Sequence, residues 1–268
     1  MTTGHVTTGA LHGKRILVTA ASQGLGLAIA TRLADAGGTL AICARGPEGL
    51  AAAADTIAAR TGRRPVTLTT DLADPAKVEA LARDAIVALG GLDILIVNSG
   101  HIQYGSLEEL PDSAWYEAFE LLLMSAVRLA RAAIPALRES GGGSIVFVGS
   151  ASVREPPPHL LLSSVMRLGV VGLAKTLART LAPENIRVNV VAPGHFATGR
   201  VRRRIADQIE AGMTADEATR AVAGNIPMQR VGDPQELAEL VAFLVEGKAG
   251  FLTGGHVVLD GGASAYPL

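Results

Sequence analysis

Short apolar strands alternate with helical segments along most of this chain, and that alternation is the feature that most restricts its fold. The expected strands are Arg15–Thr19, Thr39–Cys43, Val66–Thr70, Asp93–Val97, Ser144–Val148, Arg187–Val191 and His256–Leu259. Nearly continuous apolar strands are typical of a parallel sheet that helices cover on both faces. The chain therefore predicts an α/β fold, a single doubly wound domain with a seven-stranded parallel sheet flanked by helices.

The intervening segments carry helix signals, including Asp74-Pro75 and Asp233-Pro234 as capping pairs. Helices are expected from the first glycine turn to Ala36 and over Pro47–Ala59, Ala76–Leu89, Ser113–Arg138, Leu160–Leu181 and the stretch after Asp233. Residues 1–13 are Thr/Gly-rich and predict a flexible N-terminal tail before one domain over 14–268. The polar, arginine-rich stretch at 197–225 is an insertion, either a substrate lid or a solvated helical surface.

Composition excludes several classes of protein. The chain is 49% hydrophobic and only 18% charged, which is incompatible with intrinsic disorder. A net charge of −1 predicts no nucleic-acid partner, and no apolar run reaches the roughly 20 residues of a membrane span. The single cysteine, Cys43, and the lack of a Cys/His cluster predict no bound metal and favour a cytoplasmic location.

A glycine-rich turn connects the first strand to the first helix. It contains Thr19, Ser22, Gln23, Gly24, Leu25 and Gly26. Glycines in this context let the backbone approach a pyrophosphate, whose charge the free amides of the helix start would meet. An ordinary tight turn is the alternative, so the loop alone indicates a dinucleotide site without establishing one.

The spacing of further motifs resembles the short-chain dehydrogenase/reductase family from about Lys14 to Gly262. The matching motifs are Thr19 to Gly26, Val97-Asn98-Ser99-Gly100, Asp71-Leu72, Gly149-Ser150, Pro193-Gly194 and Asp260-Gly261-Gly262. Within the family, the chain is most similar to the branch of 3-oxoacyl-carrier-protein reductases. The resemblance implies a Rossmann-type fold and a nicotinamide cofactor, bound by the glycine loop together with Asp71, Leu72, Asn98, Ser99, Gly100, Arg167, Pro193, Gly194, Phe196 and Thr198.

The residues after the second strand favour NADP over NAD. A carboxylate about 20 residues beyond the glycine loop would bind the ribose hydroxyls of NAD, but this chain has Ala44 followed by Arg45. A guanidinium can bind a 2′-phosphate through two parallel hydrogen bonds. The alternative is that Arg45 is an ordinary exposed arginine.

The catalytic positions depart from what the resemblance implies. The family uses a Tyr, a Lys four residues later, a Ser and usually an Asn; here Ser150 is kept, while Ser163, Arg167 and Leu122 stand at the other three positions. None of the chain's 3 tyrosines has a lysine four residues later. A serine hydroxyl is a much weaker acid than a phenol, whereas Arg167 keeps a cation that could hold a ribose or a developing alkoxide.

Histidines are the candidates for moving the proton. A helix that started directly after Pro158 would place His159, Ser163 and Arg167 on one face, while His101 and His195 follow two of the cofactor motifs. Structural or solvent-facing histidines are the alternative for all three.

These residues predict an atypical NADP-dependent oxidoreductase of a small carbonyl or alcohol, with Ser150, Ser163, Arg167 and His159 in the site. The alternative is a non-redox use of the fold, as a dehydratase, epimerase, isomerase or noncatalytic dinucleotide-binding protein. The resemblance further implies a homodimer or homotetramer that packs through the helices around Ser113–Arg138 and Leu160–Leu181.

Overall fold

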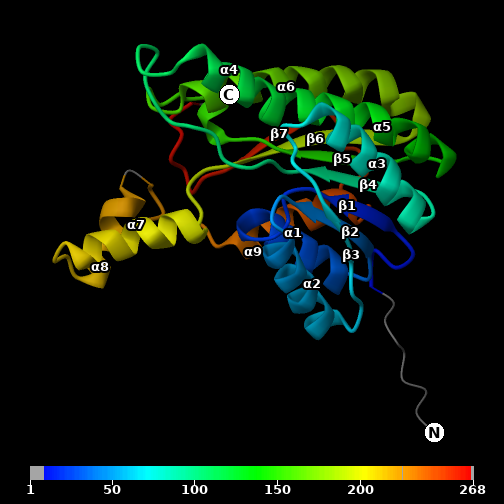
Figure 1. Ribbon diagram of the computed structural model, residues 1–268, viewed down its shortest axis with the longest axis horizontal. Helices are drawn as coiled ribbons and strands as arrows, with labels where there is room; N and C mark the ends of the chain where they lie inside the picture. The colour runs from blue at the N-terminus through cyan, green and yellow to red at the C-terminus, as the bar shows by residue number, and fades with distance from the viewer. Residues whose placement is uncertain (1–8, 225, 267–268) are drawn as a thin grey trace, which may run out of the picture.

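The computed structural model describes residues 9–224 and 226–266. Within them the chain forms one all-parallel sheet in the order β3-β2-β1-β4-β5-β6-β7 (Figure 1). The strands are β1 (Arg15–Val18), β2 (Thr39–Ala44), β3 (Val66–Thr69), β4 (Ile94–Val97), β5 (Gly143–Val148), β6 (Ile186–Pro193) and β7 (His256–Leu259). The order of strands changes direction between β1 and β4, and ligands of such sheets bind outside the carboxyl ends of the strands there. The expected doubly wound Rossmann-type domain is confirmed.

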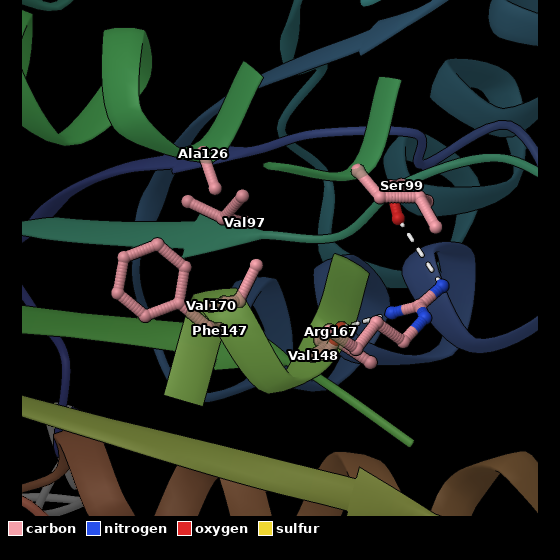
Figure 2. Close-up of a pocket in the computed structure, with 8 residues that line it drawn as sticks. Val97, Ser99, Ala126, Phe147, Val148, Arg167 and Val170 are labelled. Carbon is pink, nitrogen blue, oxygen red and sulfur yellow. Dashed lines mark hydrogen bonds between the residues drawn. The ribbon is translucent and has the colours of Figure 1, made fainter. Parts of the chain in front are cut away.

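Helices cover both faces of the sheet, and each face has its own buried core. The helices are α1 (Gly24–Asp35), α2 (Pro47–Thr61), α3 (Pro75–Leu89), α4 (Asp112–Ala118), α5 (Ser125–Glu139), α6 (Leu161–Leu181), α7 (Gly199–Glu210), α8 (Ala215–Ala223) and α9 (Pro234–Val245). One core joins α1, α2 and α9 to the sheet, and the other joins α3, α5 and α6 to the opposite face. In the second core Val97, Phe147 and Val170 bring β4, β5 and α6 together (Figure 2).

Helix α6 belongs to this second core. By length and composition its stretch Leu161–Glu184 could cross a membrane, but core helices share that composition. In the structure it packs beside β6 and buries, among others, Leu162, Met166 and Val170.

The long helical stretch expected over about Ser113–Arg138 is helical throughout, but it is not one continuous α-helix. A π-helical turn over Phe119–Met124 separates α4 from α5. Hydrophobic periodicity cannot detect this turn, because the extra residue leaves the apolar side chains Leu121 and Leu122 facing the core. π-Helical turns are frequently found at functional sites, and this one holds Leu122, one of the changed catalytic positions.

The structure adds detail to two segments of the predicted domain, the N-terminal stretch and the insertion at 197–225. Residues 1–8 of the expected tail lie outside the described part, but Leu11 is buried and its N–H donates to the Ala36 carbonyl at 2.8 Å. The described chain is therefore packed from before Lys14. The stretch at 197–225 contains α7 and α8, which lie side by side and extend away from the sheet (Figure 1).

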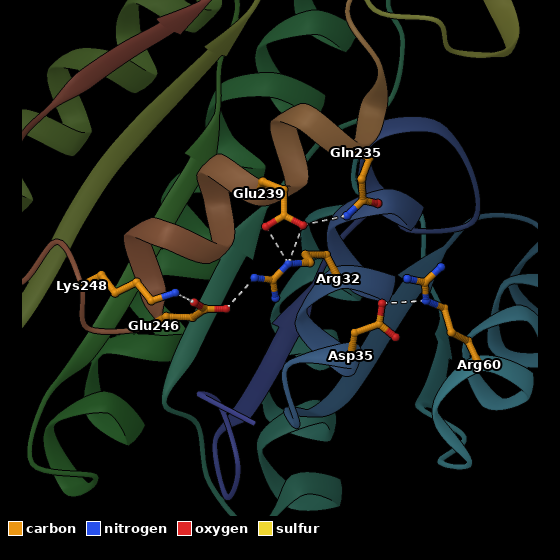
Figure 3. A network of polar contacts seen from close by, with 7 residues as sticks. All are labelled: Arg32, Asp35, Arg60, Gln235, Glu239, Glu246 and Lys248. Atoms are coloured by element: carbon orange, nitrogen blue, oxygen red, sulfur yellow. Dashed lines mark hydrogen bonds and ion pairs between the residues drawn. The ribbon is translucent and has the colours of Figure 1, made fainter. Parts of the chain in front are cut away.

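A polar network ties α1 to α9 across one face (Figure 3). The Arg32 guanidinium donates to Glu239 at 2.8 Å and to Glu246 at 2.8 Å, and Lys248 donates to Glu246 at 2.7 Å. The Glu246 side chain is only 3% exposed. Burial raises the pKa of Glu246, but the hydrogen bonds from Lys248 and Arg32 outweigh it, so the pKa is lower than that of a free glutamate.

Replacing Arg32 by methionine should destabilise the fold by about 2–3 kcal/mol, because a nearly buried carboxylate loses one of its two cations. The loss should be largest at neutral pH. Since folding lowers the pKa of Glu246, its contribution is present above the unfolded pKa of about 4.3 and disappears as the pH falls through the folded value. Urea unfolding at pH 7 and pH 3.5 measures both effects. The matched control is Arg60→Met, which breaks an exposed pair with Asp35 and should cost less than about 1 kcal/mol; equal losses in the two variants would contradict the assignment.

Candidate active site

The glycine loop is held to the neighbouring strand by a buried threonine. Thr19, at the end of β1, is fully buried, and its hydroxyl donates to the Asn98 carbonyl at 2.5 Å. The same oxygen accepts the Asn98 N–H at 2.9 Å, and the Asn98 amide donates to the Ala20 carbonyl at 3.1 Å. Two motifs that lie far apart in the sequence are thereby fixed at the point where the strand order reverses.

Two positions of the loop require glycine. Gly24 has φ +58°, a conformation that side chains rarely adopt, and it starts α1. At Gly26, a Cβ would lie 2.2 Å from the Ala20 carbonyl oxygen and 2.8 Å from the Asn98 amide nitrogen. The Gln23 side chain does not cap the helix. The first amides of α1 are therefore left for another acceptor, which fits a pyrophosphate.

The remaining expected cofactor residues follow the carboxyl ends of neighbouring strands. Arg45 is exposed directly after β2, and Asp71 accepts the Ala73 N–H at 3.0 Å beside the buried Leu72 after β3. After β6, Thr198 lies against the glycine loop: a Cβ added at Gly24 would be 3.4 Å from the Thr198 methyl group. Phe196 is buried under Gly232, while the Gly194 N–H donates to the Leu259 carbonyl at 2.9 Å. These residues surround one edge of the sheet, as a dinucleotide site requires.

Arg167 joins the ends of β4 and β5 at the centre of this edge (Figure 2). Its guanidinium donates to the Val148 carbonyl at 2.7 Å, to the Gly149 carbonyl at 3.0 Å and to the Ser99 hydroxyl at 3.3 Å. Burial of the guanidinium lowers the pKa of Arg167 to about 10, so the group is still a cation at neutral pH. A small cavity beside it is lined by Leu122, Phe147 and Val170.

The two candidate serines lie in different local environments. Ser150 follows β5, and its oxygen accepts from the Ser152 N–H at 3.2 Å and the Ser152 hydroxyl at 2.9 Å. It therefore caps the short 3₁₀ turn Ala151–Val153. Ser163, in the first turn of α6 and one turn before Arg167, is 9% exposed.

His159 does not share a helical face with Ser163 and Arg167, because α6 begins at Leu161. Pro157 accepts the Leu160 N–H in a turn that precedes the helix. His159 instead pairs with the loop after β4: its carbonyl accepts the Gly105 N–H at 3.3 Å, and Gly105 bridges to Leu160.

Sequence spacing missed one aromatic residue at this place. The Tyr104 ring contacts the His101 imidazole edge-on, with centroids 4.8 Å apart, and the His159 imidazole at 6.0 Å. His195 belongs to the same region: burial lowers its pKa, and the positive charges of Arg204 and His159 lower it further. The pairing of Gly105 with Leu160 creates this group, and no local motif signals it.

Among residues 9–224 and 226–266, no group of three or more metal-ligating side chains is found.

The glycine loop, the helix start and the polar groups at the strand ends define a dinucleotide-binding α/β protein. The nature of its relatives is consistent with that class.

Residues 19–264 match the family model described as enoyl-(acyl carrier protein) reductase. The chain is 33% identical to the 3-oxoacyl-(acyl-carrier-protein) reductase of Escherichia coli K12, over 93% of this chain and 97% of that one. It also resembles L-sorbose reductase of Gluconobacter frateurii, solved with NADPH and L-sorbose, with a TM-score of 0.92, 31% identity and coverage of 97% and 99%. A third similar structure is an NADPH-bound short-chain oxidoreductase of Pseudomonas aeruginosa PAO1, described as containing an atypical catalytic center, with a TM-score of 0.86, 33% identity and coverage of 94% and 97%. The chain belongs to the short-chain dehydrogenase/reductase family.

Proposed function

We propose that this protein is an NADP-dependent oxidoreductase of a small carbonyl or alcohol, with an atypical catalytic centre. The observation that carries the proposal is the placement of the Arg167 guanidinium against Ser99, at the strand ends beside the glycine loop. This keeps a cation at the position from which the family lysine acts, while Ser163 replaces the tyrosine one turn earlier. NADPH in two similar structures supports the choice of cofactor.

The residues around the loop fit a dinucleotide. The amides of Gly24, Leu25 and Gly26 would meet the pyrophosphate, with Thr19 and Asn98 fixing the loop. The other proposed contacts are Ser22, Gln23, Arg45, Asp71, Leu72, Ser99, Gly100, Arg167, Pro193, Gly194, Phe196 and Thr198. Bound NADPH would supply the hydride.

The side chains around Arg167 would bind the substrate oxygen and stabilise the negative charge that develops on it. Arg167 is cationic and directs donors toward the strand ends, so it can stabilise an alkoxide that forms beside it. Ser163 and Ser150 supply hydroxyl groups for orienting the oxygen, and His159 supplies an ionisable ring at the rim. The insertion with α7 and α8 is proposed as the substrate lid.

Cofactor titration followed by a substrate panel tests this function. We expect nicotinamide fluorescence to report NADPH binding, and absorbance at the reduced nicotinamide band to fall with at least one member of a panel of ketoses, including L-sorbose, and 3-oxoacyl thioesters. If the protein bound neither NADPH nor NADH, the proposal would be overturned. NADPH binding without turnover across the panel would instead favour a non-redox or noncatalytic protein on the same fold.

Arg45→Ala should raise the dissociation constant of NADPH by about 10- to 100-fold and that of NADH by less than about threefold. The reason is that only NADPH carries a 2′-phosphate for the guanidinium, and a hydrogen bond to a charged group contributes about 1.5–3 kcal/mol. Fluorescence titration of both cofactors measures the ratio. Equal weakening of NADPH and NADH would show that Arg45 does not bind the phosphate.

A homodimer or homotetramer is proposed to form through the long helices. Large apolar side chains are exposed there, among them Phe119 on the π turn and Val165 and Leu168 on α6. Light scattering tests this assembly. A cytoplasmic location is also proposed, consistent with Cys43, a buried thiol whose pKa burial raises to about 12.

A further inference from the structure

The hydroxyl of Ser99 and the guanidinium of Arg167 meet where the ends of β4 and β5 lie side by side (Figure 2). We propose that Ser99 is a positioning residue: it fixes the plane of the Arg167 guanidinium, so that the site works with an arginine where the family has a lysine. This inference rests on the proposed function, because it concerns the orientation of the cation that the proposed reaction uses. It gives the Ser99 side chain a task other than the cofactor contact proposed above.

Three hydrogen bonds to the ends of two strands hold the guanidinium. Its Nη1 donates to the Val148 carbonyl at 2.7 Å and to the Gly149 carbonyl at 3.0 Å, both at the end of β5. Its Nη2 donates to the Ser99 hydroxyl at 3.3 Å, which follows the end of β4. Because both carbonyl bonds come from one nitrogen, they leave the planar group free to turn about that nitrogen. The bond to Ser99 stops this rotation.

The fixed orientation decides which donor is left for a ligand. A guanidinium carries five N–H groups, and the three bonds use those of Nη1 and Nη2 only. Within residues 9–224 and 226–266, no group accepts a hydrogen bond from the Arg167 Nε, and this nitrogen still reaches solvent. The Nε–H group is therefore the donor that a substrate or ribose oxygen can meet, and Ser99 sets its direction.

The side chains around the guanidinium suit an arginine better than a lysine. The small cavity beside it is lined by apolar side chains, among them Leu122, Phe147 and Val170, and Ser99 is the other polar side chain that lines it. A guanidinium is more weakly hydrated than an ammonium, so it tolerates such a wall better. Since Leu122 stands where the family usually has an asparagine, that position offers no acceptor. Ser99 supplies the side-chain acceptor instead.

Removing the hydroxyl should slow the reaction without weakening cofactor binding. For Ser99→Ala we expect kcat/KM to fall by about 5- to 30-fold, as for the loss of one long hydrogen bond from a charged group. The dissociation constant of NADPH, measured by fluorescence titration, should stay within about threefold of the wild type. Ser99→Thr keeps a hydroxyl and should restore kcat/KM to within about threefold of the wild type.

Ser140→Ala is the matched control. The Ser140 hydroxyl accepts from the Arg15 Nη2 at 2.7 Å, so this variant removes the same kind of contact at the opposite edge of the sheet, where β1 begins. It should leave kcat/KM and the affinity for NADPH unchanged. A fall in kcat/KM equal to that of Ser99→Ala would mean that the loss comes from a weakened fold and would contradict the positioning role.

Two further measurements separate positioning from a merely structural role. In the Arg167→Lys background, Ser99→Ala should change kcat/KM by less than about twofold, because the guanidinium through which Ser99 acts is gone. The second measurement does not depend on turnover: Arg167 should react several-fold faster with phenylglyoxal in Ser99→Ala than in the wild type, as peptide mass spectra report. The exposed Arg45 should react at the same rate in both proteins.

The negative results are distinguishable. If the wild type turns over a panel substrate and Ser99→Ala either keeps its kcat/KM or loses NADPH affinity by the same factor, Ser99 does not position Arg167 and the proposed function stands. Unchanged labelling of Arg167, or an undiminished effect of Ser99→Ala in the Arg167→Lys background, leads to the same conclusion. If the wild type turns over no panel substrate, the proposed function fails and the positioning role fails with it.

Discussion

Gly26→Ala is expected to weaken NADPH binding by at least about 100-fold and to lower the free energy of unfolding by about 1–3 kcal/mol. The added methyl group would lie 2.2 Å from the Ala20 carbonyl oxygen, which is backbone and cannot rotate away. It would also displace the Asn98 amide, which bonds that same carbonyl. The loop must then move at the place where the pyrophosphate would bind. Fluorescence titration with NADPH and urea unfolding measure the two losses.

Gly49→Ala is the matched control, because the same methyl group is added in the first turns of α2, where the nearest atom is the Ser22 Cβ at 3.7 Å. An alanine is the better helix former there, so the variant should be as stable as the wild type or up to about 1 kcal/mol more stable. If Gly26→Ala bound NADPH as tightly as the wild type does, the close approach of Gly26 to the Ala20 carbonyl would not be needed for cofactor binding.

The fold was predictable because its signals are local and repeated. Most of the strands are short apolar runs, and helix starts such as Asp74-Pro75 carry their own capping residues, confirmed by the Asp74 side chain accepting from the Ala76 and Lys77 amides. A parallel sheet follows from the alternation of such elements. The glycine loop was equally visible, since close approach and positive φ leave a requirement for glycine at fixed positions.

The part of the site around Arg167 and His159 was less predictable, because its geometry depends on contacts between segments that are distant in the sequence. The start of α6 excludes His159 from the helix, and only the bridge between Gly105 and Leu160 brings Tyr104 beside it. The π turn around Leu122 was hidden by its buried apolar side chains. Spacing along the chain can nominate residues for a site, but it cannot show which loops pair above it.

Arg167→Met should separate function from stability. We expect kcat/KM to fall by about 10²- to 10³-fold, as for the loss of a group that stabilises a developing oxyanion, while the free energy of unfolding changes by less than about 2 kcal/mol. The stability effect is small because two terms oppose one another. Burial lowers the pKa of Arg167 to about 10, so holding this cation in the fold has a desolvation cost, which methionine removes. Against this gain, the Val148 and Gly149 carbonyls lose their donor.

Arg187→Met provides the comparison, since Arg187 lies near the opposite end of β6, donates to the Ala249 carbonyl at 3.3 Å and also has a pKa lowered by burial. Its replacement should leave turnover and NADPH affinity unchanged. A large loss of stability in Arg167→Met, with turnover reduced only in proportion to the folded fraction, would make Arg167 a clamp between β4 and β5 rather than a binding group. Because strongly perturbed pKa values cluster at functional sites and the Arg167 guanidinium, unlike that of Arg187, lies at the strand ends beside the glycine loop, we expect function to be the greater loss.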